Sequence, residues 1–224
     1  MKQQHIELIK KELEIGIKEN FGSGNELFLV SSGKVIVTDP CYDKVSLYNT
    51  TLDNVAKGWW SGDVVQAKLD KLGHRICELE VNLIERHPSY LADKKDDITI
   101  HEGNVLMEIR NSDEWELEHD NIGVDSGQAG FFDADYFKDE KVVSKKAKRE
   151  IKRLDFVEPN EQWYGMSCAK TLSTAGWGVI PFGAVSQTGF GDGVYTLYVK
   201  RFFDEIVAMK IIFIPVKITE IEER

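Results

Sequence analysis

The residues in this chain best suited to chemistry are aspartates in tight turns beside apolar runs. Three turns share this arrangement: Thr38-Asp-Pro-Cys-Tyr42, Val124-Asp-Ser-Gly127 and Gly189-Phe-Gly-Asp-Gly193. Each turn adjoins a run that predicts a β-strand, so each carboxylate is expected at a strand end. Binding and catalytic side chains are often presented on such connections. We therefore expect the three turns to meet at one end of a β scaffold and to form a site there.

The candidate ligand-binding residues are the polar and glycine positions of these turns and their flanks: Asp39, Cys41, Asp125, Ser126, Gln128, Gly191, Asp192 and Tyr195. Carboxylates that share one cleft repel each other unless they are protonated, paired with a base or bridged by a cation. The pattern therefore predicts a small polar or cationic ligand. A divalent cation on Asp125, Asp133 and Asp192 is the metal hypothesis, and a metal-assisted hydrolase is its catalytic form.

Known catalytic and ion-binding motifs do not match these turns. The glycine-rich turn lacks the Gly-Lys-Ser/Thr of a phosphate loop, and a strand rather than a helix follows it. An EF-hand beginning at Asp133 is excluded because Phe137 and Lys138 occupy its fifth and sixth positions. Ser126, Ser186 and Cys41 are nucleophile candidates by position alone, since no Gly-x-Ser-x-Gly elbow is present. The sequence therefore leaves open whether the protein is an enzyme.

Structural roles compete with the binding roles. Asp39 could form an ordinary Asx turn, and Asp192 could cap backbone N–H groups of its own turn rather than project into a pocket. A second hypothesis is a non-catalytic accessory or immunity-like protein that acts through protein–protein contacts. It draws on the acidic charge, the polar segment 88–104, the pair Trp59-Trp60 and a basic helix over 144–153.

Composition restricts the partners. The 224 residues carry a net charge of −10, which argues against binding to nucleic acid or to anionic membrane surfaces. The three cysteines are far apart, and the longest apolar run is interrupted by Lys210 and Pro215, so we expect neither a disulfide framework nor a membrane span. The N-terminal stretch lacks an apolar signal core. These features predict a cytoplasmic protein whose oligomeric state is left open.

Hydrophobic periodicity predicts an α+β fold with a predominantly antiparallel β-sheet core, arranged as a sandwich or half-barrel. Alternating apolar residues predict strands over 27–30, 34–38, 63–69, 74–84, 105–109, 129–132, 194–199 and 206–214. Helical spacing over 2–20 predicts an amphipathic N-terminal helix. We expect two segments: the helix and its linker over 1–24, and a single β-rich domain over 25–218.

Two short helices complete the expected fold. Val143, Ala147, Ile151 and Leu154 recur at helical spacing, with lysines and arginines on the opposite side. A solvated face is the ordinary interpretation of that charge, and docking of an anion or a partner is the alternative. A second helix is expected to begin near Asn160, which could cap it, and to stack Tyr164, Cys168 and Leu172 at four-residue spacing.

Taken in order, three motifs resemble those of an uncharacterised domain family found in bacteria and their phages or prophages. They are Thr38-Asp-Pro-Cys-Tyr42, Gly123-Val-Asp-Ser-Gly-Gln128 and Gly189-Phe-Gly-Asp-Gly-Val-Tyr195 followed by the apolar C-terminal strand. The resemblance covers roughly residues 27–214 and leaves the N-terminal helix outside. It implies a shared fold in which these turns matter, and it implies no particular reaction. The family's commonest last motif has Tyr where this chain has Phe190.

Overall fold

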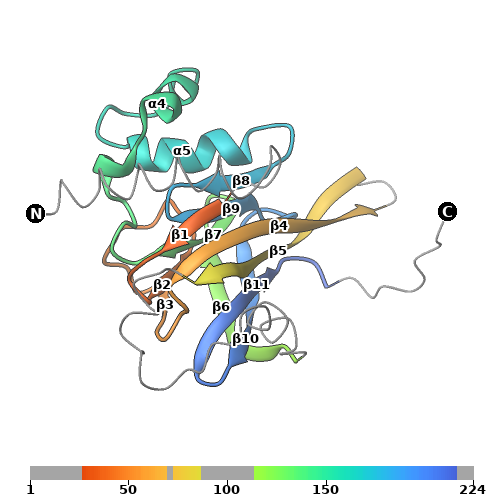
Figure 1. Ribbon diagram of the computed structural model, residues 1–224. Coiled ribbons are helices and arrows are strands. Elements are labelled where there is room, and N and C mark those ends of the chain that lie inside the picture. Colours follow the sequence, from red (N-terminus) through yellow and green to blue (C-terminus); the bar gives the residue numbers. More distant parts are fainter. Residues whose placement is uncertain (1–26, 70–72, 87–113, 216–224) are drawn as a thin grey trace, which may run out of the picture.

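The computed structural model describes residues 27–69, 73–86 and 114–215 (Figure 1). The helix predicted over 2–20, the polar segment 88–104 and the strand predicted over 105–109 lie outside the described residues. The boundary near residue 24 therefore stays a prediction.

Two antiparallel sheets form the body of the molecule. The six-stranded sheet has the order β1 (Leu27–Val30), β4 (Gly58–Leu69), β5 (Gly73–Arg86), β11 (Glu205–Ile212), β10 (Gly193–Phe202) and β6 (Glu116–Val124). The five-stranded sheet has the order β3 (Thr50–Leu52), β2 (Val35–Thr38), β7 (Gln128–Asp133), β9 (Gly183–Gln187) and β8 (Trp177–Ile180). All pairings of these strands are antiparallel. The predicted antiparallel β-rich core is confirmed, and it is built as two stacked sheets.

The five-stranded sheet is buried on both faces, and β7 shows why. All six residues of β7 are buried. Ala129 and Phe131 belong to the apolar core that both sheets share, whereas Phe132 belongs to a second core beneath the helices. Because successive side chains of a strand point to opposite faces, one apolar run serves both cores. Each large side chain that is fully buried contributes roughly 1.5–3 kcal/mol of hydrophobic free energy.

Two helices and one 3₁₀ turn cover the outer face of the five-stranded sheet, beside β8 and β9 (Figure 1). They are η2 (Glu140–Val142), α4 (Lys145–Ile151) and α5 (Gln162–Thr171). The second core is centred on Trp163, whose ring meets Phe132 and Phe137 edge-on at centroid distances of 5.1 Å. Within the described part of the chain, no helix is both long and apolar enough to cross a bilayer.

The helix ends differ from expectation at one point. Ser144 caps α4 by accepting a hydrogen bond from the Ala147 N–H at 3.1 Å. The predicted cap of α5 by Asn160 is wrong, because the N-cap position is Glu161 and its side chain makes no capping bond. Instead the Glu140 carboxylate of η2 accepts the Trp163 N–H, at 3.0 and 3.2 Å. The first turn of α5 is thus satisfied by a different element.

The Trp59-Trp60 pair is not an exposed anchor. The strand β4 begins at Gly58 rather than near residue 63, so both tryptophans lie within the sheet. Trp60 is fully buried, and its ring N–H donates to the Ala56 carbonyl at 3.1 Å. Trp59 packs partly buried against the second core. Trp60 therefore cannot act as an exposed interface anchor.

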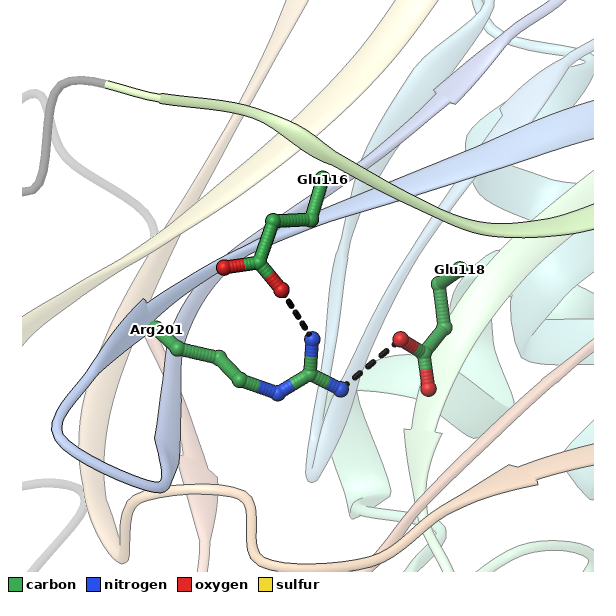
Figure 2. A network of polar contacts seen from close by, with 3 residues as sticks. All are labelled: Glu116, Glu118 and Arg201. Carbon is green, nitrogen blue, oxygen red and sulfur yellow. Dashed lines mark hydrogen bonds and ion pairs between the residues drawn. The ribbon is translucent and has the colours of Figure 1, made fainter.

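Ion pairs join neighbouring strands of the six-stranded sheet. Arg201 on β10 donates to Glu116 and Glu118 on the edge strand β6, both at 2.7 Å (Figure 2). On the neighbouring strands, Lys210 pairs with Glu78 at 3.4 Å. Partly exposed ion pairs of this kind contribute only up to about 1 kcal/mol each. They favour the register of the edge strand more than the total stability.

Candidate functional site

The first two of the three turns are joined through the buried Asp39 carboxylate. One of its oxygens accepts the N–H groups of Asp125 and Ser126, at 2.9 and 2.6 Å. The other accepts the Cys41 N–H at 2.8 Å and the Ser126 hydroxyl at 2.6 Å. The bond to Cys41 is the local Asx turn that the sequence allows, and the remaining three bonds hold a distant segment. Asp39 therefore fixes the 124–127 turn in place.

The glycine-rich turn packs against the same place. The Thr188 N–H donates to the Gly127 carbonyl at 3.1 Å, and Gly193 pairs with Val124 across the β6–β10 ladder. A Cβ atom on Gly127 would lie 3.5 Å from the Gly191 Cα, so the two backbones nearly touch. Both glycines have positive φ, +66° and +95°, which side-chain-bearing residues rarely adopt. The structure thus brings all three turns together.

Tyr195 and Thr188 shape this turn from within. Both hydroxyls donate to the Gly191 carbonyl, each at 2.6 Å. The Tyr195 ring is buried in the main core and meets Phe213 edge-on. Tyr195 therefore holds the glycine-rich turn in place. Its side chain lines neither of the two cavities described below.

The other two turn aspartates lie on the surface. The β6–β10 ladder ends at the pair Val124–Gly193. Asp125 comes directly after Val124, Asp192 comes directly before Gly193, and both are exposed. Asp125 is hydrogen-bonded to the Tyr42 hydroxyl, whose pKa is raised by burial and by that carboxylate. Asp192 makes no hydrogen bond or ion pair within 27–69, 73–86 and 114–215, so its predicted capping role is wrong.

Asp133 lies at the opposite end of the sheet. It is buried and accepts the N–H groups of Ser31, Ser32 and Asp135 at 2.6, 2.9 and 3.0 Å, together with the Ser31 hydroxyl at 3.3 Å. Burial raises the pKa of Asp133, and the backbone N–H groups of Ser32 and Ser31 act in the opposite direction. Asp133 therefore fixes the β1–β2 connection.

The predicted cation triad of Asp125, Asp133 and Asp192 is wrong. Asp133 faces Val35 in the β2–β7 ladder, four residues before Asp39. At the strand rise per residue, the four residues from Val35 to Asp39 span roughly 13 Å. Among the residues that the structure describes, no three His, Cys, Asp or Glu side chains form a cluster able to hold a metal ion.

A buried polar network runs inward from the second turn to α5. The Gln128 amide accepts the Thr171 hydroxyl at 2.8 Å and donates to the Ser126 hydroxyl at 3.4 Å and the Cys168 thiol at 3.8 Å. Tyr164 shares hydrogen bonds with Ser126 and Cys168. The helical spacing of Tyr164, Cys168 and Thr171 places them on one face of α5, while Leu172, expected in that stripe, is exposed.

A cavity of about 490 Å³ opens beside this network. Three of the predicted site residues line it, namely Ser126, Gln128 and Gly191. The remaining walls come from the α5–β8 connection, the 187–190 segment and the β4–β5 hairpin, including Gln66, His74, Arg75, Thr171 and Gln187. No sequence motif marks His74 or Arg75, because they reach the cavity only through the length of the hairpin. None of the lining residues within 27–69, 73–86 and 114–215 is an aspartate or a glutamate.

A larger cavity of about 860 Å³ lies on the other side of the α5–β8 connection. Its walls carry charges of both signs, Asp63, Glu150, Arg153 and Lys170, and none of the predicted site residues. The smaller cavity is therefore the one that the second and third turns line.

The cysteines near the site are unsuited to nucleophilic catalysis. Burial, assisted by the charge of Asp39, raises the pKa of Cys41 to about 12. Burial also raises the pKa of Cys168. Since the thiolate is the nucleophile, both thiols are inert near neutral pH.

Alkylation of Cys41 by iodoacetamide at pH 8 is accordingly expected to be about 1,000-fold slower in the folded protein than in a denatured chain, whose thiols have ordinary pKa values. Peptide mapping by mass spectrometry measures the rate at Cys41 directly. The folded rate should increase about ten-fold per pH unit up to pH 9 and beyond, because the thiolate fraction does. Equal rates in the folded and denatured protein would contradict the protected thiol.

Ser126 also lacks the arrangement of a catalytic serine. In a Ser-His-Asp triad the carboxylate orients a histidine, which in turn bonds the serine. Here the Asp39 carboxylate accepts the Ser126 hydroxyl itself. Ser186, the other serine candidate, is buried and donates to the Gln187 carbonyl at 3.0 Å. The geometry favours a fixed hydrogen-bonding site over a nucleophilic one.

Comparison with known proteins places the chain in a family. The model of a family described as a protein of unknown function, DUF4241, matches residues 28–211, a stretch that includes all three turns. No curated protein and no solved structure matches the chain. The expected membership of an uncharacterised family is confirmed, and the chain belongs to the DUF4241 family.

Proposed function

We propose that this chain is a binding domain that holds a small polar ligand in the cavity of about 490 Å³. The observation that carries the proposal is that the second and third turns line one polar cavity, with the second turn fixed from behind by Asp39 of the first. Ligand sites commonly have volumes of roughly 300–1,000 Å³ and a few fixed polar groups. Ser126, Gln128 and Thr171 supply such groups, and their mutual hydrogen bonds hold them in place before any ligand arrives.

Catalysis is the less favoured role of this site. The thiols of Cys41 and Cys168 stay protonated, and Ser126 is bonded to a carboxylate without an intervening imidazole. The free state of all three cysteines supports the proposal that the protein works in the reducing cytoplasm.

Retention of a small molecule tests the binding role. The purified protein is incubated with a cellular small-molecule extract, passed through a desalting column and analysed by mass spectrometry. Gln128→Met keeps the length of the side chain and removes its amide. We expect a compound that the wild type retains and that Gln128→Met retains about ten-fold less, a loss of about 1.4 kcal/mol.

Arg201→Gln is the matched control, because Arg201 pairs with Glu116 and Glu118 at the β6–β10 edge and does not line the cavity, so it should not affect retention. Melting curves of both variants exclude unfolding as the cause. Retention that is absent, or unchanged in Gln128→Met, would contradict the proposal.

A protein partner is the second candidate, and the segment after the first turn favours it. Val45 and Leu47 are 96% and 102% exposed. The ring of Tyr48 beside them packs at a tilt against the ring of Tyr42, with a centroid distance of 5.2 Å. Adjacent exposed apolar side chains are typical of interaction surfaces. A partner lost with Val45→Ser and Leu47→Ser, and kept with Gln128→Met, would support this candidate over the ligand.

A further inference from the structure

We infer that the ligand of this cavity carries an oxyanion group, a carboxylate or a phosphate, and that Arg75 binds it. This inference rests on the proposed function and names the ligand class for the same cavity. It replaces the cationic ligand that the acidic turns favour in the sequence.

The charge of the lining is the first observation. The chain contains 38 acidic residues against 28 lysines and arginines, yet none of the described residues that line the cavity carries a carboxylate. If as many residues as line the cavity were drawn at random from this chain, about three of them would be aspartates or glutamates. Arg75 and His74 are the ionisable side chains of the lining, so the local charge is opposite in sign to that of the whole protein. A cationic ligand would find no carboxylate there to pair with.

The bonding of Arg75 is the second observation. Its guanidinium donates to the neighbouring His74 carbonyl at 3.1 Å and has no carboxylate partner among the described residues. By contrast, Arg86 pairs with Glu205 at 2.6 Å, and Arg201 pairs with two glutamates. A guanidinium has five N–H donors in a planar fork that matches carboxylates and phosphates. Arg75 therefore keeps donors for a ligand in a protein rich in competing acids.

The position of the nearby acids gives the ligand an orientation. Asp125 and Asp192 are exposed beside the turns, and Asp39 lies behind Ser126 with its charge shared among four donors. These carboxylates disfavour an anion at the turn side of the cavity. The oxyanion is therefore placed at the hairpin side against Arg75, and the uncharged polar part of the ligand lies toward Gln128 and Thr171.

An amide-resolved NMR titration with inorganic phosphate and, separately, with acetate tests this. A single guanidinium–oxyanion contact gives a Kd on the order of 10 mM, so the probes are added well beyond that concentration. We expect shifts at the amides of Gly127, Gly189 and Gly191 and at Arg75 itself. Arg75→Gln should weaken this binding at least about five-fold, and Arg75→Lys should weaken it less because the charge remains. Arg201→Gln should leave the titration unchanged.

The outcomes separate the two proposals. Binding of phosphate alone assigns a phosphate group, and binding of acetate alone or of both assigns a carboxylate-sized oxyanion. Shifts confined to the basic helix α4, no shift at all, or equal binding by Arg75→Gln would overturn the inference. Any of these three results can occur together with a neutral or cationic compound that is retained through Gln128. In that case the proposed function stands without the anion. If no compound is retained either, both fall.

Discussion

Replacing Asp39 by alanine is expected to lower the free energy of unfolding by about 3–5 kcal/mol, because it leaves three partly buried N–H groups and one hydroxyl without their buried acceptor. These groups belong to Cys41, Asp125 and Ser126, so the loss is spread over two turns. The same change should release Ser126 from its position at the cavity. Urea denaturation followed by tryptophan fluorescence measures the loss.

Asp43→Ala is the matched control, since Asp43 lies exposed in the same connection and no bond to its carboxylate is present in the described structure. Its expected effect is below about 0.5 kcal/mol. Asp39→Asn should fall between the two, because an amide oxygen keeps part of the acceptor set while the NH₂ group opposes a donor. A loss for Asp39→Ala no larger than that of the control would show that the carboxylate does not hold the turns.

Asp133→Ala is expected to cost about 3–4 kcal/mol, for the same reason at the other end of β7. Here the substitution to asparagine should be much milder, about 1–2 kcal/mol. Three of the four donors meet one oxygen, Oδ2, which the amide oxygen can replace, and only the Asp135 N–H then faces the NH₂ group. Calorimetric or urea unfolding of both variants measures this graded series.

The exposed neighbour Asp135 provides the control, and Asp135→Asn should change stability by less than about 0.5 kcal/mol. If Asp133→Asn were as damaging as Asp133→Ala, the negative charge rather than the acceptor geometry would be the stabilising feature. That result would contradict the hydrogen-bond account of the β1–β2 connection.

Local patterns predict the strands that fill the core and the meeting of the turns. The alternation over β10 and β11 is strong because Leu197, Val199, Met209 and Ile211 all face the other sheet. The strand β6 is not predicted, because only Ile122 and Val124 among its residues are buried and the rest of this edge strand faces solvent. Its pairing with β10 supplies the order that its own composition does not show.

Local sequence patterns do not predict which groups the buried aspartates hydrogen-bond. The sequence shows Asp39 and Asp133 as turn residues, and whether such a carboxylate bonds its own neighbours or a distant turn depends on the stacking of the sheets. The same holds for Arg75, which reaches the cavity only because the β4–β5 hairpin extends over the glycine-rich turn. The burial of Trp60 is also beyond local patterns, because a tryptophan pair after glycine occurs both in loops and at the start of buried strands.

The two aspartate clamps also bear on how the chain reaches its native state. The bonds of Asp39 to the second turn span 86 and 87 residues, and those of Asp133 to the β1–β2 connection span 101 and 102. Contacts so remote along the chain close only after the intervening polypeptide has been ordered, and such topologies fold slowly. We therefore expect the clamps to form late in folding and to act chiefly by slowing unfolding, so that they lengthen the lifetime of the folded protein more than they hasten its formation.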